Sequence, residues 1–137
     1  MAKLVVGLSS GSVDKLVGLS VMMSGAVADD MDVEVYVLLT AARAFIKGNE
    51  DLVDSVVEYP HLKDEMMAKL TELKQPGWVE SFNQAKEFGN VKIYICSLAG
   101  KLWGGNTKED FNELVDDICG IFQYIESAQS ADLHITI

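Results

Sequence analysis

The thiol of Cys96 is the side chain in this sequence that is best placed to do chemistry. It ends the short run VKIYIC at residues 91–96, whose β-branched and aromatic residues predict a buried strand. A thiolate is a strong nucleophile, and a cation such as Lys101 or the N-termini of nearby helices would favour the ionised form. The alternative is a structural role, since free cysteine is commonly a small buried hydrophobe, and position alone favours that alternative.

The segment GLSSGS, which ends the apolar run at residues 3–8, offers backbone amides and hydroxyl groups. The residues concerned are Ser9, Ser10, Gly11 and Ser12. They could bind a small anion beside the N-terminus of the next helix. Their spacing matches neither GxGxxG nor GxxxxGK[ST]. A tight turn in which Ser12 caps the helix is therefore favoured over strong nucleotide binding.

Two further side chains follow predicted strands. Arg43, the only arginine, comes just after residues 32–39 and could bind a substrate anion, although pairing with one of the 21 acidic side chains is the favoured alternative. Trp103 follows Cys96 and could cover a ligand or dock a partner, or equally anchor its segment on the domain. Ligands of open parallel sheets bind beyond the carboxyl ends of the strands, so we expect all these residues at one edge of the sheet.

Apolar runs with two different periods alternate along the chain and predict strands and helices in turn. Strands are expected at residues 3–8, 32–39, 91–96 and 133–137. Helices are expected at residues 13–29, 40–47, 61–74 and 78–88, and from a cap at Thr107 along a stripe that ends at Ile125. Residues 97–106 are expected to be a loop, and residues 50–58 are ambiguous. This order predicts one α/β domain over residues 1–137, with a mainly parallel sheet of four or five strands between helix layers.

The second cysteine, Cys119, falls inside the last predicted helix. It lies about twelve residues from the helix start, which corresponds to roughly 18 Å along the axis. That helix should run back toward the amino ends of the strands, whereas a disulfide needs α-carbons within about 7 Å of each other. We therefore expect Cys119 to be a core residue far from Cys96.

The predicted helix at residues 13–29 is apolar around nearly its whole circumference. Such a helix must be covered on two sides. The sheet covers one side, and a second subunit would cover the other, so we expect a homo-oligomer. A neighbouring helix of the same chain is the alternative.

Composition excludes several classes of partner. A formal charge of −10 makes nucleic acids and anionic membranes poor partners. The apolar run at the N-terminus is too short for a signal peptide, and no run is long enough to span a membrane, so we expect a cytoplasmic location. The two cysteines and two histidines show no metal-ligand spacing, and we expect neither a metal nor another cofactor.

A short first strand, the segment SSGSVDKL, a long apolar helix, DVEVYVLLT and VKIYICSLAG follow one another along most of the chain. In this order they resemble the DsrE/DsrF-like family of small sulfur carriers, which includes TusD-type sulfur relay subunits. The resemblance implies a flavodoxin-like fold, homo- or hetero-oligomers, and a cysteine that carries sulfur as a persulfide or bound thiosulfate. By position that cysteine is Cys96, and the implied partners are proteins that donate and accept the sulfur. A non-covalent anion- or nucleotide-binding module and a purely structural oligomer subunit are the alternatives.

Overall fold

The computed structural model describes residues 2–49 and 57–137, so most of the ambiguous segment at 50–58 lies outside the described residues. Five strands form one sheet in the order β4-β3-β2-β1-β5, and all neighbouring pairs are parallel. The strands are β1 (Lys3–Leu8), β2 (Asp32–Val37), β3 (Val91–Cys96), β4 (Asp117–Cys119) and β5 (Leu133–Thr136). The predicted α/β class with a parallel sheet is therefore confirmed.

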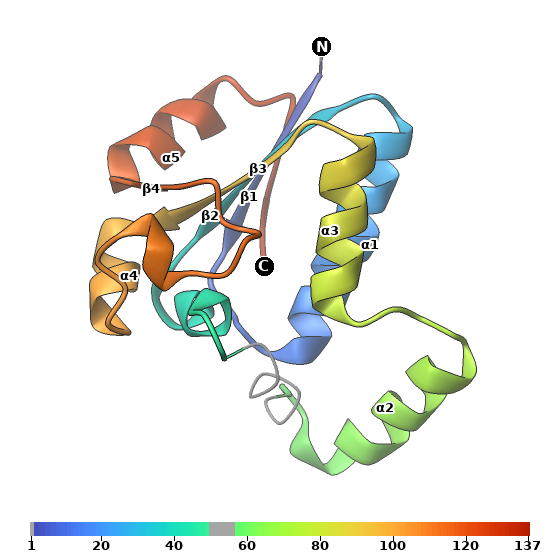
Figure 1. Cartoon of the computed structure of the whole chain (residues 1–137). Coiled ribbons are helices and arrows are strands. Elements are labelled where there is room, and N and C mark those ends of the chain that lie inside the picture. Colours follow the sequence, from blue (N-terminus) through green and yellow to red (C-terminus); the bar gives the residue numbers. More distant parts are fainter. Residues whose placement is uncertain (1, 50–56) are drawn as a thin grey trace.

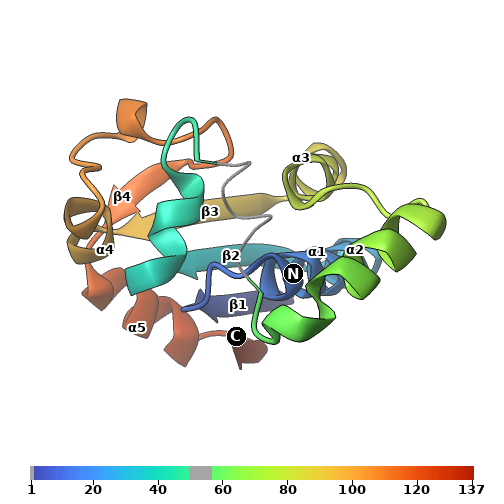
Figure 2. The same ribbon diagram turned by 90° about the horizontal axis from the view of Figure 1, so that it is seen from below.

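Helices cover both faces of this sheet, as in a flavodoxin-like three-layer fold (Figure 1). The α-helices are α1 (Val13–Ala28), α2 (Lys63–Glu72), α3 (Trp78–Phe88), α4 (Ser97–Leu102) and α5 (Ile121–Gln129). Short 3-10 helices are η1 (Leu39–Phe45), η3 (Pro60–Leu62) and η4 (Lys108–Asp110). The helices α1 and α3 lie side by side on one face of the sheet, and α5 lies on the opposite face (Figures 1 and 2).

The core is divided unequally between the two faces. The main cluster fills the side of α1 and α3, and it includes the alternate residues Val91, Ile93 and Ile95 of β3. A smaller cluster on the α5 side contains Val5, Tyr36, Cys119 and Tyr124. Because successive strand residues point to opposite faces, β1, β2, β3 and β4 contribute to both clusters.

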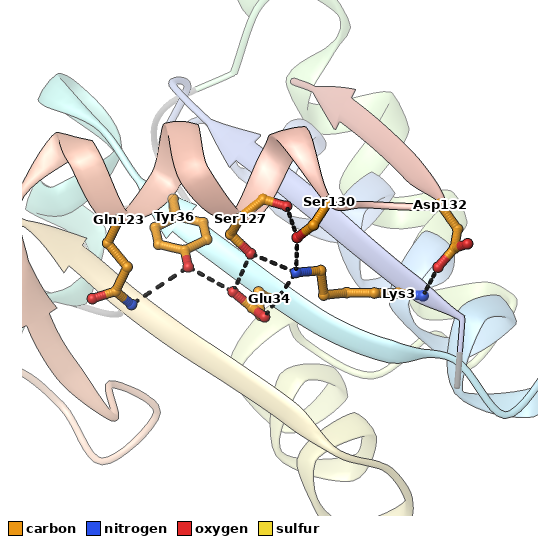
Figure 3. Close-up of polar contacts among 7 residues, drawn as sticks. All are labelled: Lys3, Glu34, Tyr36, Gln123, Ser127, Ser130 and Asp132. Carbon is orange, nitrogen blue, oxygen red and sulfur yellow. Dashed lines mark hydrogen bonds and ion pairs between the residues drawn. The ribbon is translucent and has the colours of Figure 1, made fainter.

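Polar contacts hold α5 to the sheet (Figure 3). The Glu34 carboxylate on β2 accepts hydrogen bonds from the Tyr36 hydroxyl and from Ser127 Oγ on α5, both at 2.6 Å. Lys3 Nζ on β1 donates to Ser127 Oγ at 3.0 Å and to Ser130 Oγ at 2.9 Å. Burial and the hydrogen bond to Glu34 raise the pKa of Tyr36 to about 12. These contacts fix the position of α5. The smaller hydrophobic cluster on this face also contains Cys119 of β4.

The single long helix predicted from Thr107 to Ile125 is wrong. The segment instead contains η4, irregular backbone with a turn at residues 113–114, β4 and then α5, which begins after Gly120 at its N-cap. The irregular part joins β3 at its end, where Asp116 N donates to Ile93 O at 2.8 Å and Asp116 also pairs with Lys86. Its apolar residues are buried in the main cluster without helical structure, so the helical spacing of the stripe was coincidental.

Two smaller differences concern the segments after β2 and β3. Residues 97–102, expected to be part of a loop, form α4, and Ala99 and Gly100 of that helix are buried. The second strand ends at Val37 rather than at residue 39, because Leu39 adopts a positive φ of 39° and begins η1.

The apolar helix α1 packs on both the sheet and α3. Most of its apolar surface is thereby covered within the chain. This is the alternative in which a neighbouring helix, and not a second subunit, covers the helix. Val21 and Met22 stay exposed on it. Across residues 2–49 and 57–137, the structure contains no helix with the length and apolar character required to cross a membrane.

Candidate functional site

Cys96 lies at the carboxyl edge of the sheet, as the sequence predicts. It is the last residue of β3 and the N-cap residue of α4. Its thiol is free and its side chain is partly exposed, while it also contacts the main core cluster. A β-strand on one side and a helix on the other hold its backbone, so this thiol has a fixed place at the surface.

Cys119 lies directly beside Cys96, and the prediction that the two are far apart is wrong. Cys119 is the last residue of β4, and the β3–β4 register pairs it with Cys96. It is also free, but only 8 % exposed. Burial, with smaller contributions from the neighbouring Cys96 and Asp117, raises the pKa of the Cys119 thiol to about 11.

A cavity of about 320 Å³ brings together most of the other predicted site residues. Its lining residues are Ser10, Gly11, Ser12, Thr40, Arg43, Ala44 and Trp103. They come from the β1–α1 turn, from η1 and from the turn after α4. The carboxyl edge of the sheet therefore combines a cavity with hydroxyl groups, one guanidinium and an indole.

Local contacts explain why these segments meet. Trp103 Nε1 donates to Leu39 O at 3.0 Å, and its ring lies 6.0 Å from Cζ of Arg43, within range of a cation–π interaction. A Cβ at Gly11 would lie 3.2 Å from both Ala41 Cα and Thr40 O, so the absence of a side chain there lets the β1–α1 turn approach η1. Trp103 thus anchors its segment on η1 and also borders the cavity.

The hydroxyl groups of the first turn bond mainly to one another and to the backbone. Ser10 Oγ and Ser12 Oγ are 3.1 Å apart, and Ser12 occupies the N-cap position of α1 without a side-chain hydrogen bond to the helix. Ser9 Oγ donates to Ile137 O at 3.2 Å, while Thr40 Oγ1 donates to Ser9 O at 3.0 Å. The predicted side-chain cap by Ser12 is therefore not formed.

Three of the predicted site residues do not line this cavity. Cys96 lies at the end of β3, and Lys101 is an exposed residue on α4. Ser9 donates its hydroxyl to the carbonyl oxygen of the C-terminal Ile137, and its own carbonyl oxygen accepts from Thr40. The predicted residues thus separate into a thiol centre at Cys96 and a polar cavity around Arg43.

Cys119 was not predicted as a neighbour of Cys96, and Ala44 was not predicted as a lining residue, whereas Thr40 belongs to the segment expected at this edge. Gly120 was the available signal for Cys119, because glycine is unfavourable in a helix interior and common at helix starts. Nothing distinguishes Ala44 in the sequence.

A larger cavity of about 700 Å³ lies along residues 108–116. Two lysines, Lys47 and Lys108, line it together with Glu109, Glu113 and Asp116. The Nδ2 atom of buried Asn112 has no hydrogen-bond partner there. Charges of both signs are mixed around this cavity and do not specify a ligand, so the candidate site is the region of Cys96 and Arg43.

His134 lies on β5, at the opposite edge of the sheet from β4, where its Nε2 is 2.6 Å from the Tyr124 hydroxyl. Within the described part of the chain, no three His, Cys, Asp or Glu side chains cluster in a way that could hold a metal ion.

In comparisons with known proteins, no family model matches the chain, and no curated protein matches it either. The resemblance to the DsrE/DsrF-like family therefore stays a prediction from the residues.

Proposed function

We propose that the protein is a sulfur carrier of the DsrE/DsrF-like type, which holds sulfane sulfur or thiosulfate on Cys96 and passes it to a partner thiol. The observation that carries this proposal is the free, partly exposed Cys96 thiol at the carboxyl edge of the sheet. A carrier needs a nucleophile that a second protein can reach and a backbone that holds it in place. Both conditions are met at the junction of β3 and α4.

The transfer requires only thiol exchange. The Cys96 thiolate attacks the outer sulfur of a donor persulfide, and the thiolate of the donor leaves. A thiolate of the acceptor then attacks the same outer sulfur, and Cys96 leaves as the thiolate. Sulfane sulfur keeps its oxidation state in both steps, so no additional redox group is needed.

The proposal implies protein partners and a reducing compartment. The donor and acceptor proteins must bring their thiols to Cys96, and Leu98 and Leu102 of neighbouring α4 are exposed apolar residues that they could contact. Exposed Ile121, Phe122 and Ile125 on α5 offer a surface for a second copy of the chain. A cytoplasmic location fits the two free thiols.

Replacing Cys96 with alanine is expected to abolish sulfur loading. After incubation with cysteine persulfide, thiosulfate or tetrathionate, mass spectrometry should detect a sulfur adduct on the unmodified protein and none above background on the Cys96→Ala variant. The reason is that the exposed thiol is the nucleophile, whereas Cys119 is buried and holds its proton at neutral pH because its pKa is raised.

The Cys119→Ala variant is the matched control, because it also lacks one thiol but keeps Cys96. It should carry at least as much of the sulfur adduct as the unmodified protein does. A Cys96 thiol that stays unmodified with every donor would remove the carrier function.

The cavity around Arg43 favours a second candidate function, the non-covalent binding of a small anion or nucleotide. None of the described residues places a carboxylate within ion-pair distance of Arg43, so its guanidinium has a charge to offer a ligand. Ser10, Ser12 and Thr40 add hydroxyl donors around the same cavity. A thiol is not required for this function.

Phosphate, sulfate and adenosine monophosphate test this second candidate. If the cavity binds one of them, it should raise the melting temperature of the protein and of Cys96→Ala by the same amount, and the rise should disappear in Arg43→Gln. Lys101→Gln is the matched control, because it removes a cation outside the cavity. Equal shifts in Arg43→Gln and in the unmodified protein would contradict binding at Arg43.

A further inference from the structure

Two free thiols end neighbouring strands of the sheet at the same level. Cys96 is the last residue of β3, Cys119 is the last residue of β4, and the parallel register pairs them. The preceding pair, Ile95 and Ile118, packs on the main core. This pairing is independent of any ligand, and it gives Cys96 a neighbouring thiol within its own chain.

The spacing of paired strands suits a disulfide. Neighbouring strands lie about 4.8 Å apart, and disulfides join α-carbons that are roughly 4.4–6.8 Å apart. Both residues are strand ends, followed by α4 on one side and by Gly120 on the other. The backbone after Cys119 can therefore adjust to the bond at Gly120 without disturbing a strand interior, while β3 and α4 hold the backbone of Cys96.

The surroundings of the two thiols differ. The side chain of Cys96 is partly exposed, so a donor protein can reach it. It also contacts the main core cluster, so it must turn toward the α5 side of the sheet to meet Cys119. Cys119 is 8 % exposed and packs with Val5, Tyr36 and Tyr124. A partner protein cannot readily reach such a thiol, but the neighbouring strand of the same chain can.

We propose that Cys119 is the resolving thiol of Cys96: it displaces sulfur held on Cys96 as hydrosulfide and closes a Cys96–Cys119 disulfide. This inference rests on the proposed carrier function, because it needs a persulfide on Cys96. It adds a second fate for the bound sulfur, which is released when no acceptor protein takes it.

The step balances with the two cysteines alone. The Cys119 thiol loses its proton to water, and its sulfur attacks Sγ of the Cys96 persulfide. The bond between the two cysteine sulfurs forms, the bond from Cys96 Sγ to the outer sulfur breaks, and that sulfur leaves as hydrosulfide. The two cysteine sulfurs are linked at the oxidation level of a disulfide, and the sulfane sulfur is reduced to sulfide. A dithiol reductant, of protein or small-molecule class, then returns both thiols.

The step should accelerate with pH. The ionisable groups around Cys119 are Asp117 on its own strand, Cys96 and Tyr94 on β3, Tyr36 on β2 and Tyr124 on α5. None of them is a cation, and burial is the main reason why the pKa of Cys119 is raised. The thiolate fraction therefore increases about tenfold for each pH unit below this pKa, and hydrosulfide release should follow it.

The test compares the unmodified protein with Cys119→Ala and with Ile118→Val, which alters packing on β4 but keeps both thiols. Each protein is loaded with cysteine persulfide, freed of excess donor and followed for hydrosulfide release. Mass spectrometry after alkylation of free thiols maps the products.

The unmodified protein and Ile118→Val should release hydrosulfide and gain the Cys96–Cys119 disulfide. Cys119→Ala should keep its adduct and release hydrosulfide at least about tenfold more slowly, because an intramolecular thiol acts at an effective concentration on the order of millimolar or higher.

The outcomes separate this inference from the proposed function. Loading of Cys96 in all three proteins with equal release rates would overturn the resolving role and leave the carrier function intact. An adduct that moves to Cys119 would overturn it as well. A Cys96 that takes up no sulfur in any of the proteins would overturn both. If Cys119→Ala does not fold, Cys119→Ser provides the same comparison.

Discussion

Replacing Phe45 with alanine is expected to lower the free energy of unfolding by about 3–5 kcal/mol. Phe45 ends η1 and is fully buried. Its ring centroid lies 5.2 Å from that of Trp78 in an edge-on contact and 6.1 Å from that of Phe82, both on α3. The truncated side chain would leave a cavity between η1 and α3 that the surrounding structure fills only in part. Urea unfolding followed by circular dichroism measures the change.

Phe88→Ala is the matched control for Phe45→Ala. Phe88 ends α3 and is 76 % exposed, so the same substitution should change the free energy of unfolding by no more than about 0.5 kcal/mol. Equal destabilisation by the two variants would show that Phe45 does not anchor η1. Because Arg43 and Ala44 precede Phe45 and line the cavity, Phe45→Ala should also weaken the anion binding that we propose for this cavity.

Two strands were predicted with the correct bounds, and both consist mainly of apolar residues. KLVVGL at residues 3–8 is nearly all buried and forms β1 with the predicted bounds. VKIYIC forms β3 with the predicted bounds and places Cys96 at its end. Such runs are typical of parallel sheets, so the predicted α/β fold and the position of Cys96 depended on a strong local signal.

The strand β4 could not be predicted, because only three residues form it and one of them is exposed. Pairing with β3 determines its structure, and that pairing is long-range in sequence. The apolar residues from Phe111 to Ile118 have a spacing that also suits a helix face, and the local pattern favoured the helix. This one error moved Cys119 from the edge of the sheet to a helix interior and concealed its pairing with Cys96.

The cavity around Arg43 was predictable only in part. The general rule for parallel sheets indicated the correct edge and brought Ser10, Gly11, Ser12, Arg43 and Trp103 to it. The contact of Trp103 Nε1 with Leu39 O depends on the turn after α4, which the sequence analysis expected to be a loop. A local pattern indicates where a loop starts but not which distant carbonyl group it will contact.

Replacing Gly105 with alanine is expected to destabilise the protein by about 1–3 kcal/mol, because the turn after α4 has no room for a methyl group. A Cβ at Gly105 would collide with Cζ of Phe111 and lie 2.8 and 2.9 Å from two further atoms of that ring. Phe111 is buried in the main core and cannot easily move. Gly105 N also donates to Gly100 O at 2.7 Å, which closes the turn onto α4.

The substitution should therefore displace Trp103 as well as lower stability. Thermal melting measures the stability, and tryptophan fluorescence, to which Trp78 also contributes, reports whether the environment of the Trp103 indole changes relative to the unmodified protein. Gly18→Ala is the matched control, because Gly18 lies inside α1 and a Cβ there would meet nothing beyond its own helix backbone within 4 Å. There the same substitution should stabilise the protein by about 0.4–1 kcal/mol, since alanine loses less backbone entropy in a helix. Changes in stability of opposite sign for the two variants would show that close packing on Phe111 holds the turn after α4. Changes of the same sign would contradict that packing.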